Sequence, residues 1–232
     1  MNSVEQALAN WKNSLCPKIE VGSLYARNPT AHKWKALFRS LVLREVVFWR
    51  LHDLLTQSYA LHQQEYALGA RILLRSGFET LATLIHLNQL TASVLDRTLG
   101  FHAYSEKTSI LLLGSRNETT KHKSISIVTV LEKCDRRYEG LMKLYADLSE
   151  SAHPNFEGTC IGYSTVDHDD HVTAFTNRWA EMYGDTYLQS MQLCMMTFEV
   201  EYNEVWPTLF DKLETWIEVN DATLEATKGD AK

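Results

Sequence analysis

The segment 65–89 constrains the fold most, because it is apolar over most of its circumference at helical spacing. A helix with apolar side chains on nearly every side must be surrounded by other elements. The chain is therefore predicted to form a bundle with this helix at its centre. Placed at steps of roughly 100° per residue, four ionisable side chains fall on one strip of the helix. They are Arg71, Arg75, Glu79 and His86.

Further helical patterns surround this segment in the sequence. They cover 30–64, two shorter helices within 91–113 broken near Gly100, 124–135, 138–153, 185–205 and 207–226. Thr30 is the predicted N-cap of the first, and Pro207 suits the first turn of the last. The segments 159–166 and 171–176 are rich in β-branched and aromatic residues and predict a β-hairpin, which should lean on the helices or on a partner chain because two strands alone are marginally stable.

These patterns predict a mainly α-helical bundle with one β-hairpin at 159–176. The predicted organisation is an N-terminal segment at 1–29, a single bundle domain at 30–226 that contains the hairpin, and a frayed tail at 227–232. Pro17, Gly22 and Pro29 interrupt the periodicity of the first segment, which is expected to hold a short helix and a loop.

Composition limits the class of protein. The 232 residues are 45% hydrophobic and carry a net charge of −6, which argues mildly against a general nucleic-acid binder. Residues 1–144 hold 19 Lys and Arg against 12 Asp and Glu, whereas 145–232 hold 4 against 17. No membrane-spanning run and no secretory signal is visible, and the four cysteines are scattered. We therefore expect a cytoplasmic protein with reduced thiols and no membrane association.

A second polar line lies on the predicted helix 138–153. Tyr145, Ser149 and His153 are spaced i, i+4, i+8 and share one helix face. If this face packs against the strip on 65–89, an Arg–Glu–His–Tyr cluster forms between the two helices. The alternative is a structural network, with Arg75–Glu79 as an ion pair and His153 as a helix-terminal hydrogen-bond donor.

The two motifs Arg75-x-x-x-Glu79 and Tyr145-x-x-Leu-Ser-x-x-x-His153-Pro resemble those of uncharacterised bacterial helical proteins related to the HEPN superfamily. The resemblance covers about residues 30–155 and implies a helical bundle that is often dimeric. Many HEPN proteins are metal-independent ribonucleases of toxin–antitoxin, CRISPR or phage-defence systems, and others are non-catalytic. By this resemblance His153 transfers protons, Arg75 stabilises phosphate charge, and Glu79 and Tyr145 orient the site.

Active family members place an arginine and a polar residue a few positions before the histidine. No basic residue stands at 146–148, before His153, but Arg116-Asn117 followed by His122 has that spacing. Arg116 and His122 are therefore a rival catalytic pair, with an exposed basic loop as the alternative interpretation. In that loop, Lys121, His122 and Lys123 could still contact phosphate.

The sequence predicts no cofactor and no metal site. The run Asp167-His-Asp-Asp-His171 is dense in metal-ligating types, but Asp is also a common turn former and neighbouring strand residues point to opposite faces. The chain has no Gly-rich phosphate loop, no Gly-x-Ser-x-Gly and no His-Glu-x-x-His, so common nucleotide hydrolases, esterases and zinc proteases are disfavoured.

Two functions follow as hypotheses. The first is a HEPN-like module that cleaves or binds RNA, with a defence or antitoxin protein and an identical subunit as expected partners. The second is a non-enzymatic interaction or scaffold protein in which the Arg75–Glu79–His153 cluster is structural. In that case the acidic C-terminal helices bind a basic partner or another copy.

Overall fold

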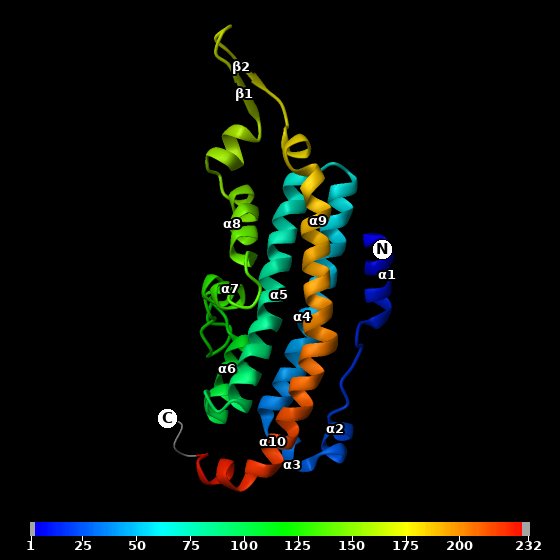
Figure 1. Cartoon of the computed structure of the whole chain (residues 1–232), viewed down its shortest axis with the longest axis vertical. Helices are drawn as coiled ribbons and strands as arrows, with labels where there is room; N and C mark the ends of the chain where they lie inside the picture. The colour runs from blue at the N-terminus through cyan, green and yellow to red at the C-terminus, as the bar shows by residue number, and fades with distance from the viewer. Residues whose placement is uncertain (1–2, 229–232) are drawn as a thin grey trace.

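The computed structural model describes residues 3–228, and within them the chain is mainly α-helical with one β-hairpin, which confirms the predicted fold class. Two antiparallel helices of 29 residues each, α4 (Lys35–Gln63) and α5 (Ala67–Leu95), form the centre (Figure 1). The five α-helices that follow α5 in the described part of the chain all pack against it. Leu74, Leu81 and Ile85 of α5 are completely buried. The apolar circumference of this segment thus predicts its central position correctly.

Two groups of helices cover the central pair. Helices α6 (Phe101–Leu113), α7 (Ile127–Asp135) and α8 (Leu141–Ala152) lie along one side of α5, and α9 (Trp179–Val200) lies along another (Figure 1). Helix α5 extends beyond the predicted end at 89, so 91–113 contains the last turn of α5 and a single further helix. Gly100 is the N-cap of α6, close to the predicted break.

The N-terminal segment forms three short helices, α1 (Val4–Ser14), α2 (Val21–Arg27) and α3 (Pro29–His32). Trp11 of α1 packs edge-on against Phe48 of α4, with ring centroids 5.5 Å apart, so α1 adds to the core. The predicted N-cap at Thr30 is wrong. Asn28 caps α3 by accepting the Ala31 amide at 2.9 Å, and α4 begins separately after Trp34.

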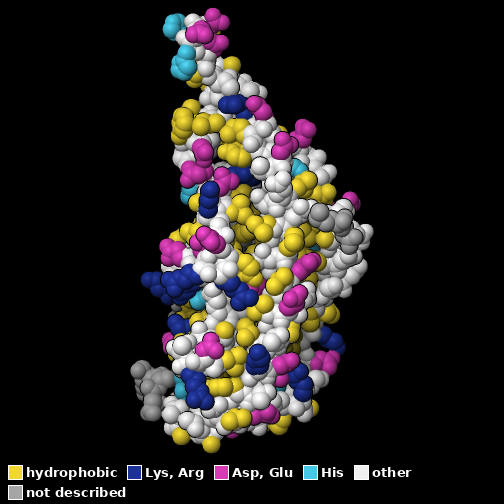
Figure 2. All heavy atoms as spheres, in the orientation of Figure 1, with side chains coloured by type: hydrophobic (Ala, Val, Ile, Leu, Met, Phe, Trp, Pro, Cys, Tyr) yellow, Lys and Arg dark blue, Asp and Glu magenta, His cyan; other side chains and the backbone are white. Residues whose placement is uncertain are grey.

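The hairpin is shorter than predicted and projects from one end of the bundle (Figure 1). Strands β1 (Ser164–Asp167) and β2 (Val172–Phe175) pair antiparallel, with Ser164 opposite Phe175. Residues 159–161, predicted as strand, belong instead to the π-helix η1 (Phe156–Ile161). All of β2 is exposed, so the hairpin does not pack against the bundle, and support from a partner chain, the other expected possibility, stays a prediction. In Figure 2 its tip carries acidic and histidine side chains.

One continuous helical segment closes the bundle, and its last part bends across one end of the bundle (Figure 1). Helix α9 passes through the π-helix η2 (Glu201–Val205) directly into α10 (Trp206–Ala226), with Pro207 in the first turn of α10 as predicted. The predicted frayed tail falls mostly outside the described residues. No helix in the described part of the chain combines the length and apolar character that crossing a membrane requires.

Candidate functional site

The polar strip of α5 and the polar line of α8 meet face to face, which is the condition for the cluster considered in the sequence. Arg75 of α5 donates from Nε to Ser149 Oγ at 2.8 Å and from Nη2 to Tyr145 Oη at 2.6 Å. The Tyr145 hydroxyl in turn donates to Glu79 Oε1 at 3.0 Å, and Arg75 Nη2 lies 3.2 Å from the same oxygen. Arg75, Glu79, Tyr145 and Ser149 therefore form one hydrogen-bonded cluster, which we call the α5–α8 cluster.

Arg71 continues this contact one turn away along α5. Its Nε donates to Ser151 Oγ at 2.7 Å, and its Nη2 donates to the Asp147 carbonyl at 3.0 Å. The guanidinium also lies 3.8 Å from the centre of the Tyr183 ring of α9. Only 3% of the Arg71 side chain is exposed, so its contacts with α8 and α9 lie inside the bundle and stabilise the packing of both helices against α5.

His153 lies outside the α5–α8 cluster. It is the exposed residue that ends α8, and its side chain makes no hydrogen bond within residues 3–228. Since α8 runs antiparallel to α5, moving from Ser149 to His153 leads past the level of Arg71, away from Glu79. The backbone there is tightly packed, because a Cβ at Gly158 would lie 1.9 Å from the His153 carbonyl oxygen. The predicted alignment therefore includes Tyr145 and Ser149 but not the His153 side chain.

The α5–α8 cluster opens into a cavity of about 660 Å³ that contains three arginines. Arg50 comes from α4, Arg75 from α5 and Arg116 from the loop after α6, and Glu79 is the one carboxylate of its lining. Thr80 and Thr83 add hydroxyls, and apolar residues of α4, α6 and α7 complete the walls. We call this cavity the arginine pocket.

Much of the hydrogen-bonding capacity of these arginines is unused. Arg50 donates from Nε to Thr80 Oγ1 at 3.2 Å, but its two terminal nitrogens have no partner among the described residues. Within the same part of the chain, Arg116 makes neither a side-chain hydrogen bond nor an ion pair. Three guanidinium groups beside one carboxylate give the pocket an excess of positive charge, which suits an anion such as phosphate.

The two rival sets of predicted catalytic residues each contribute to the arginine pocket, Arg75 and Glu79 from one set and Arg116 from the other. The loop that carries Arg116 is closed by an isolated bridge between Ser115 and Lys123, with the Ser115 amide donating to the His122 carbonyl at 2.8 Å. This closure holds Arg116 at the pocket that Arg75 and Glu79 also line. His122 is half-buried beside the loop closure and is not part of the pocket lining.

His86 is placed separately from the α5–α8 cluster. It is buried near Gln89, whose side chain donates to the Lys133 carbonyl of α7 at 2.9 Å. Burial, together with the nearby positive charge of Lys133, lowers the pKa of His86 to about 4. The imidazole is therefore neutral at pH 7 and is a poor phosphate ligand there.

The acidic tip of the hairpin is an ordinary turn. Asp167 Oδ1 accepts the amides of Asp169 at 2.9 Å and Asp170 at 3.0 Å, and His171 has a positive φ of 55°. Across residues 3–228, no three His, Cys, Asp or Glu side chains are grouped so that they could hold a metal ion.

The sequence reasoning missed a second buried network around η2. Glu201 is completely buried and accepts hydrogen bonds from Asn88 Nδ2 and Tyr138 Oη, both at 2.7 Å. Arg137 Nε lies 2.9 Å from Glu201 Oε1. We call this group the Glu201 network. Its signal was present in the sequence, because Glu201 continues the apolar face of Cys194 and Phe198 at helical spacing.

Comparison with known proteins adds no relative, since no protein-family model, no curated protein and no solved structure matches this chain significantly. The resemblance to HEPN proteins therefore stays a prediction that rests on the motifs alone. Any function has to be argued from the geometry of the α5–α8 cluster and the arginine pocket.

Proposed function

We propose that this protein binds the phosphate backbone of single-stranded RNA through the arginine pocket. The observation that carries the proposal is the convergence of Arg50, Arg75 and Arg116 on one open cavity with Glu79 as its one lining carboxylate. Arginine is suited to phosphate because its planar group donates two parallel hydrogen bonds. Arg50 and Arg116 keep free N–H groups for this purpose among the described residues.

Metal-independent cleavage is the enzymatic form of this proposal. In it, Arg75 stabilises charge on the scissile phosphate, while Glu79 and Tyr145, already hydrogen-bonded at 3.0 Å, orient the reacting groups. His153 and His122 remain rival proton-transfer residues, and neither side chain is hydrogen-bonded to the α5–α8 cluster. Catalysis by either one requires the RNA to extend beyond the pocket.

The HEPN-like motifs support a bacterial, cytoplasmic setting for the proposed activity. They support a role in phage defence or in a toxin–antitoxin pair, with a protein partner from the same system and a homodimer as the working unit. These statements rest on the resemblance, as does the choice of RNA, whereas the arginine pocket by itself supports the binding of a phosphate-bearing anion.

The first experiment measures binding of a fluorescently labelled single-stranded RNA by anisotropy over a range of salt concentrations. Affinity should fall with salt, and Arg116→Ala should weaken binding and reduce the salt slope by about 0.7, the value for one lost phosphate contact on a single strand. Lys212→Ala is the matched control, because it removes one exposed charge on α10, away from the pocket. Equal losses for both variants would contradict a specific site.

The second experiment measures RNA cleavage in the presence of a metal chelator. Glu79→Gln, His153→Ala and His122→Ala are compared with the wild-type protein. Loss of activity in Glu79→Gln and in one histidine variant supports the enzymatic form and identifies the proton-transfer residue. Binding without any cleavage removes the enzymatic form and leaves the RNA-binding proposal standing.

The alternative is a non-enzymatic scaffold whose α5–α8 cluster is structural. It is favoured by the complete pairing of Tyr145, Ser149 and Glu79 with Arg75, and by the burial of Arg71. Arg75→Ala separates the two functions. A drop of several degrees in melting temperature with unchanged RNA affinity supports the scaffold. Lost RNA affinity with only a small loss of stability, of about 1 kcal/mol, supports the binding site.

A further inference from the structure

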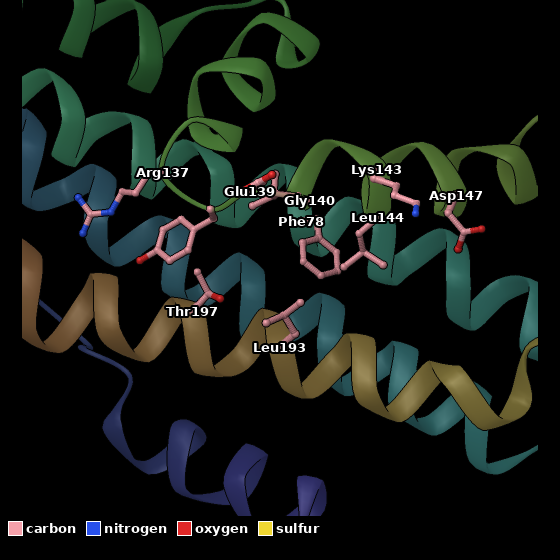
Figure 3. Close-up of a pocket in the computed structure, with 11 residues that line it drawn as sticks. Phe78, Arg137, Glu139, Gly140, Lys143, Leu144, Asp147, Leu193 and Thr197 are labelled. Carbon is pink, nitrogen blue, oxygen red and sulfur yellow. The ribbon is translucent and has the colours of Figure 1, made fainter.

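A second cavity, of about 730 Å³, lies between α8 and α9 over α5 and shares no lining residue with the arginine pocket (Figure 3). Phe78, Leu144 and Leu193 give it an apolar interior. In Figure 3, Phe78 and Leu144 lie between Arg137 at one end and Asp147 at the other. From α9, Leu193 faces Phe78, and Thr197 lies nearer the Arg137 end. The volume is in the range of pockets that hold small organic molecules.

Arg137 places a cation at one end of this cavity, and the buried carboxylate of Glu201 holds it in position. Its Nε lies 2.9 Å from Glu201 Oε1, and that carboxylate has no exposed surface. The two terminal nitrogens of Arg137 have no partner within residues 3–228, and 39% of the side chain is exposed. The buried glutamate therefore orients the guanidinium while leaving its outer N–H groups free.

The surroundings of Arg137 favour an anion. Arg137 also lines an adjacent hollow together with Lys133 and Arg136, neither of which forms an ion pair in the described part of the chain. Two carboxylates oppose this charge at the cavity itself, Glu139 and Asp147. Asp147 lies beyond the apolar interior, 3.2 Å from Arg71 Nη2, so its charge is partly balanced.

We propose that this cavity binds a small carboxylic acid with an apolar body. The carboxylate lies on the free N–H groups of Arg137, and the hydrocarbon extends over Phe78 toward Leu144 and Leu193. The fixed guanidinium supplies a bidentate anion contact, and burial of the hydrocarbon supplies most of the affinity. This site is independent of the RNA proposal.

Titration calorimetry with the full chain and decanoate, below its micelle concentration, tests the site. Decanoate should bind, and Leu193→Trp should weaken binding at least tenfold by filling the cavity. Leu188→Trp is the matched control on the same helix, because Leu188 is also exposed but does not line the cavity. No binding of decanoate, or the same affinity in both tryptophan variants, would overturn the proposal.

The role of Arg137 is tested with decanamide, a neutral analogue of the same length. Decanamide should bind at least fivefold more weakly than decanoate to the wild-type protein. Arg137→Gln should remove this difference, and Arg137→Lys should keep part of it. Circular dichroism confirms that each variant is folded, and Arg137→Lys serves if Arg137→Gln is not. Equal affinity of the wild-type protein for the acid and the amide would rule out the assigned carboxylate contact.

Discussion

The α5–α8 cluster and the Glu201 network both join helices through charged side chains, but they differ in their access to solvent. Arg75 and Glu79 are 22% and 23% exposed and open into a cavity, whereas Glu201 has no exposed surface. The buried carboxylate of Glu201 can contribute only to folding and to the orientation of Arg137, because no ligand reaches it, whereas Arg137 itself is 39% exposed. An open cluster with spare donors can also bind a ligand. Access to solvent therefore separates structural charges from candidate functional ones in this protein.

The largest loss of stability is expected from removing the buried carboxylate of the Glu201 network. Glu201→Ala leaves Tyr138 and Asn88 without their acceptor and should lower the free energy of unfolding by about 3–5 kcal/mol. Thermal melts followed by circular dichroism measure the change. Glu204→Ala, an exposed glutamate in the same π-helix, is the control and should change stability by less than about 0.5 kcal/mol. Similar melts for both variants would remove the distinction between the regions.

Acid should destabilise the protein through His86. The folded pKa of about 4 lies below the ordinary value of 6.5, so between these two values the unfolded chain binds more protons and stability falls as pH falls. The shift corresponds to about 2–3 kcal/mol lost between pH 7 and pH 4. Denaturant titrations at several pH values should show this loss, and His86→Gln should reduce it. An unchanged pH dependence in that variant would assign the loss to other groups.

Arg71 and Arg75 lie on the same helix but differ in burial, since their side chains are 3% and 22% exposed. Arg71→Ala removes three hydrogen bonds to α8, one to Ser151 and two to Asp147, together with the packing on Tyr183, and should cost about 2 kcal/mol of stability. Arg75→Ala should cost about 1 kcal/mol, because water can hydrate the groups it leaves. Urea unfolding of the two variants tests the order. A larger loss for Arg75 would mean that the α5–α8 cluster is mainly structural.

The smallest effect on stability is expected at the rim of the arginine pocket. Arg116→Ala should change the free energy of unfolding by less than about 0.5 kcal/mol, because this exposed side chain has no partner in the described part of the chain. The same urea experiment measures it. A clear destabilisation would show that Arg116 supports the loop and would weaken its assignment as a ligand-binding residue.

The sequence predicted well those features that depend on periodicity within one helix. The apolar circumference of 65–89 placed α5 at the centre, and the i, i+4 spacing of Arg75 with Glu79 and of Tyr145 with Ser149 gave the right pairing faces. The prediction that His153 shares this helix face was wrong, because α8 ends at Ala152 and His153 no longer has helical backbone geometry.

Features that need contacts between distant segments were not predictable in the same way. Arg116 reaches the arginine pocket only through the fold of its loop, and nothing in its neighbours indicates Arg75 as a companion. The start of α4 was misplaced because Thr30 and Asn28 are both good cap residues, and tertiary packing chose Asn28 for a separate short helix. Residues 159–161 look like a strand by composition, yet they coil into η1.

The π-helix η2 limits which insertions and deletions the continuous helical segment α9–η2–α10 tolerates. One residue inserted into an α-helix rotates all following residues about the helix axis by about 100°. A π turn accommodates such a residue without breaking the helix. Loss of one residue from η2 would therefore rotate Phe210, Leu213 and Ile217 of α10 away from the core they now fill. We expect the length of this segment to be more restricted than its composition, so that a single-residue deletion is more damaging here than most substitutions.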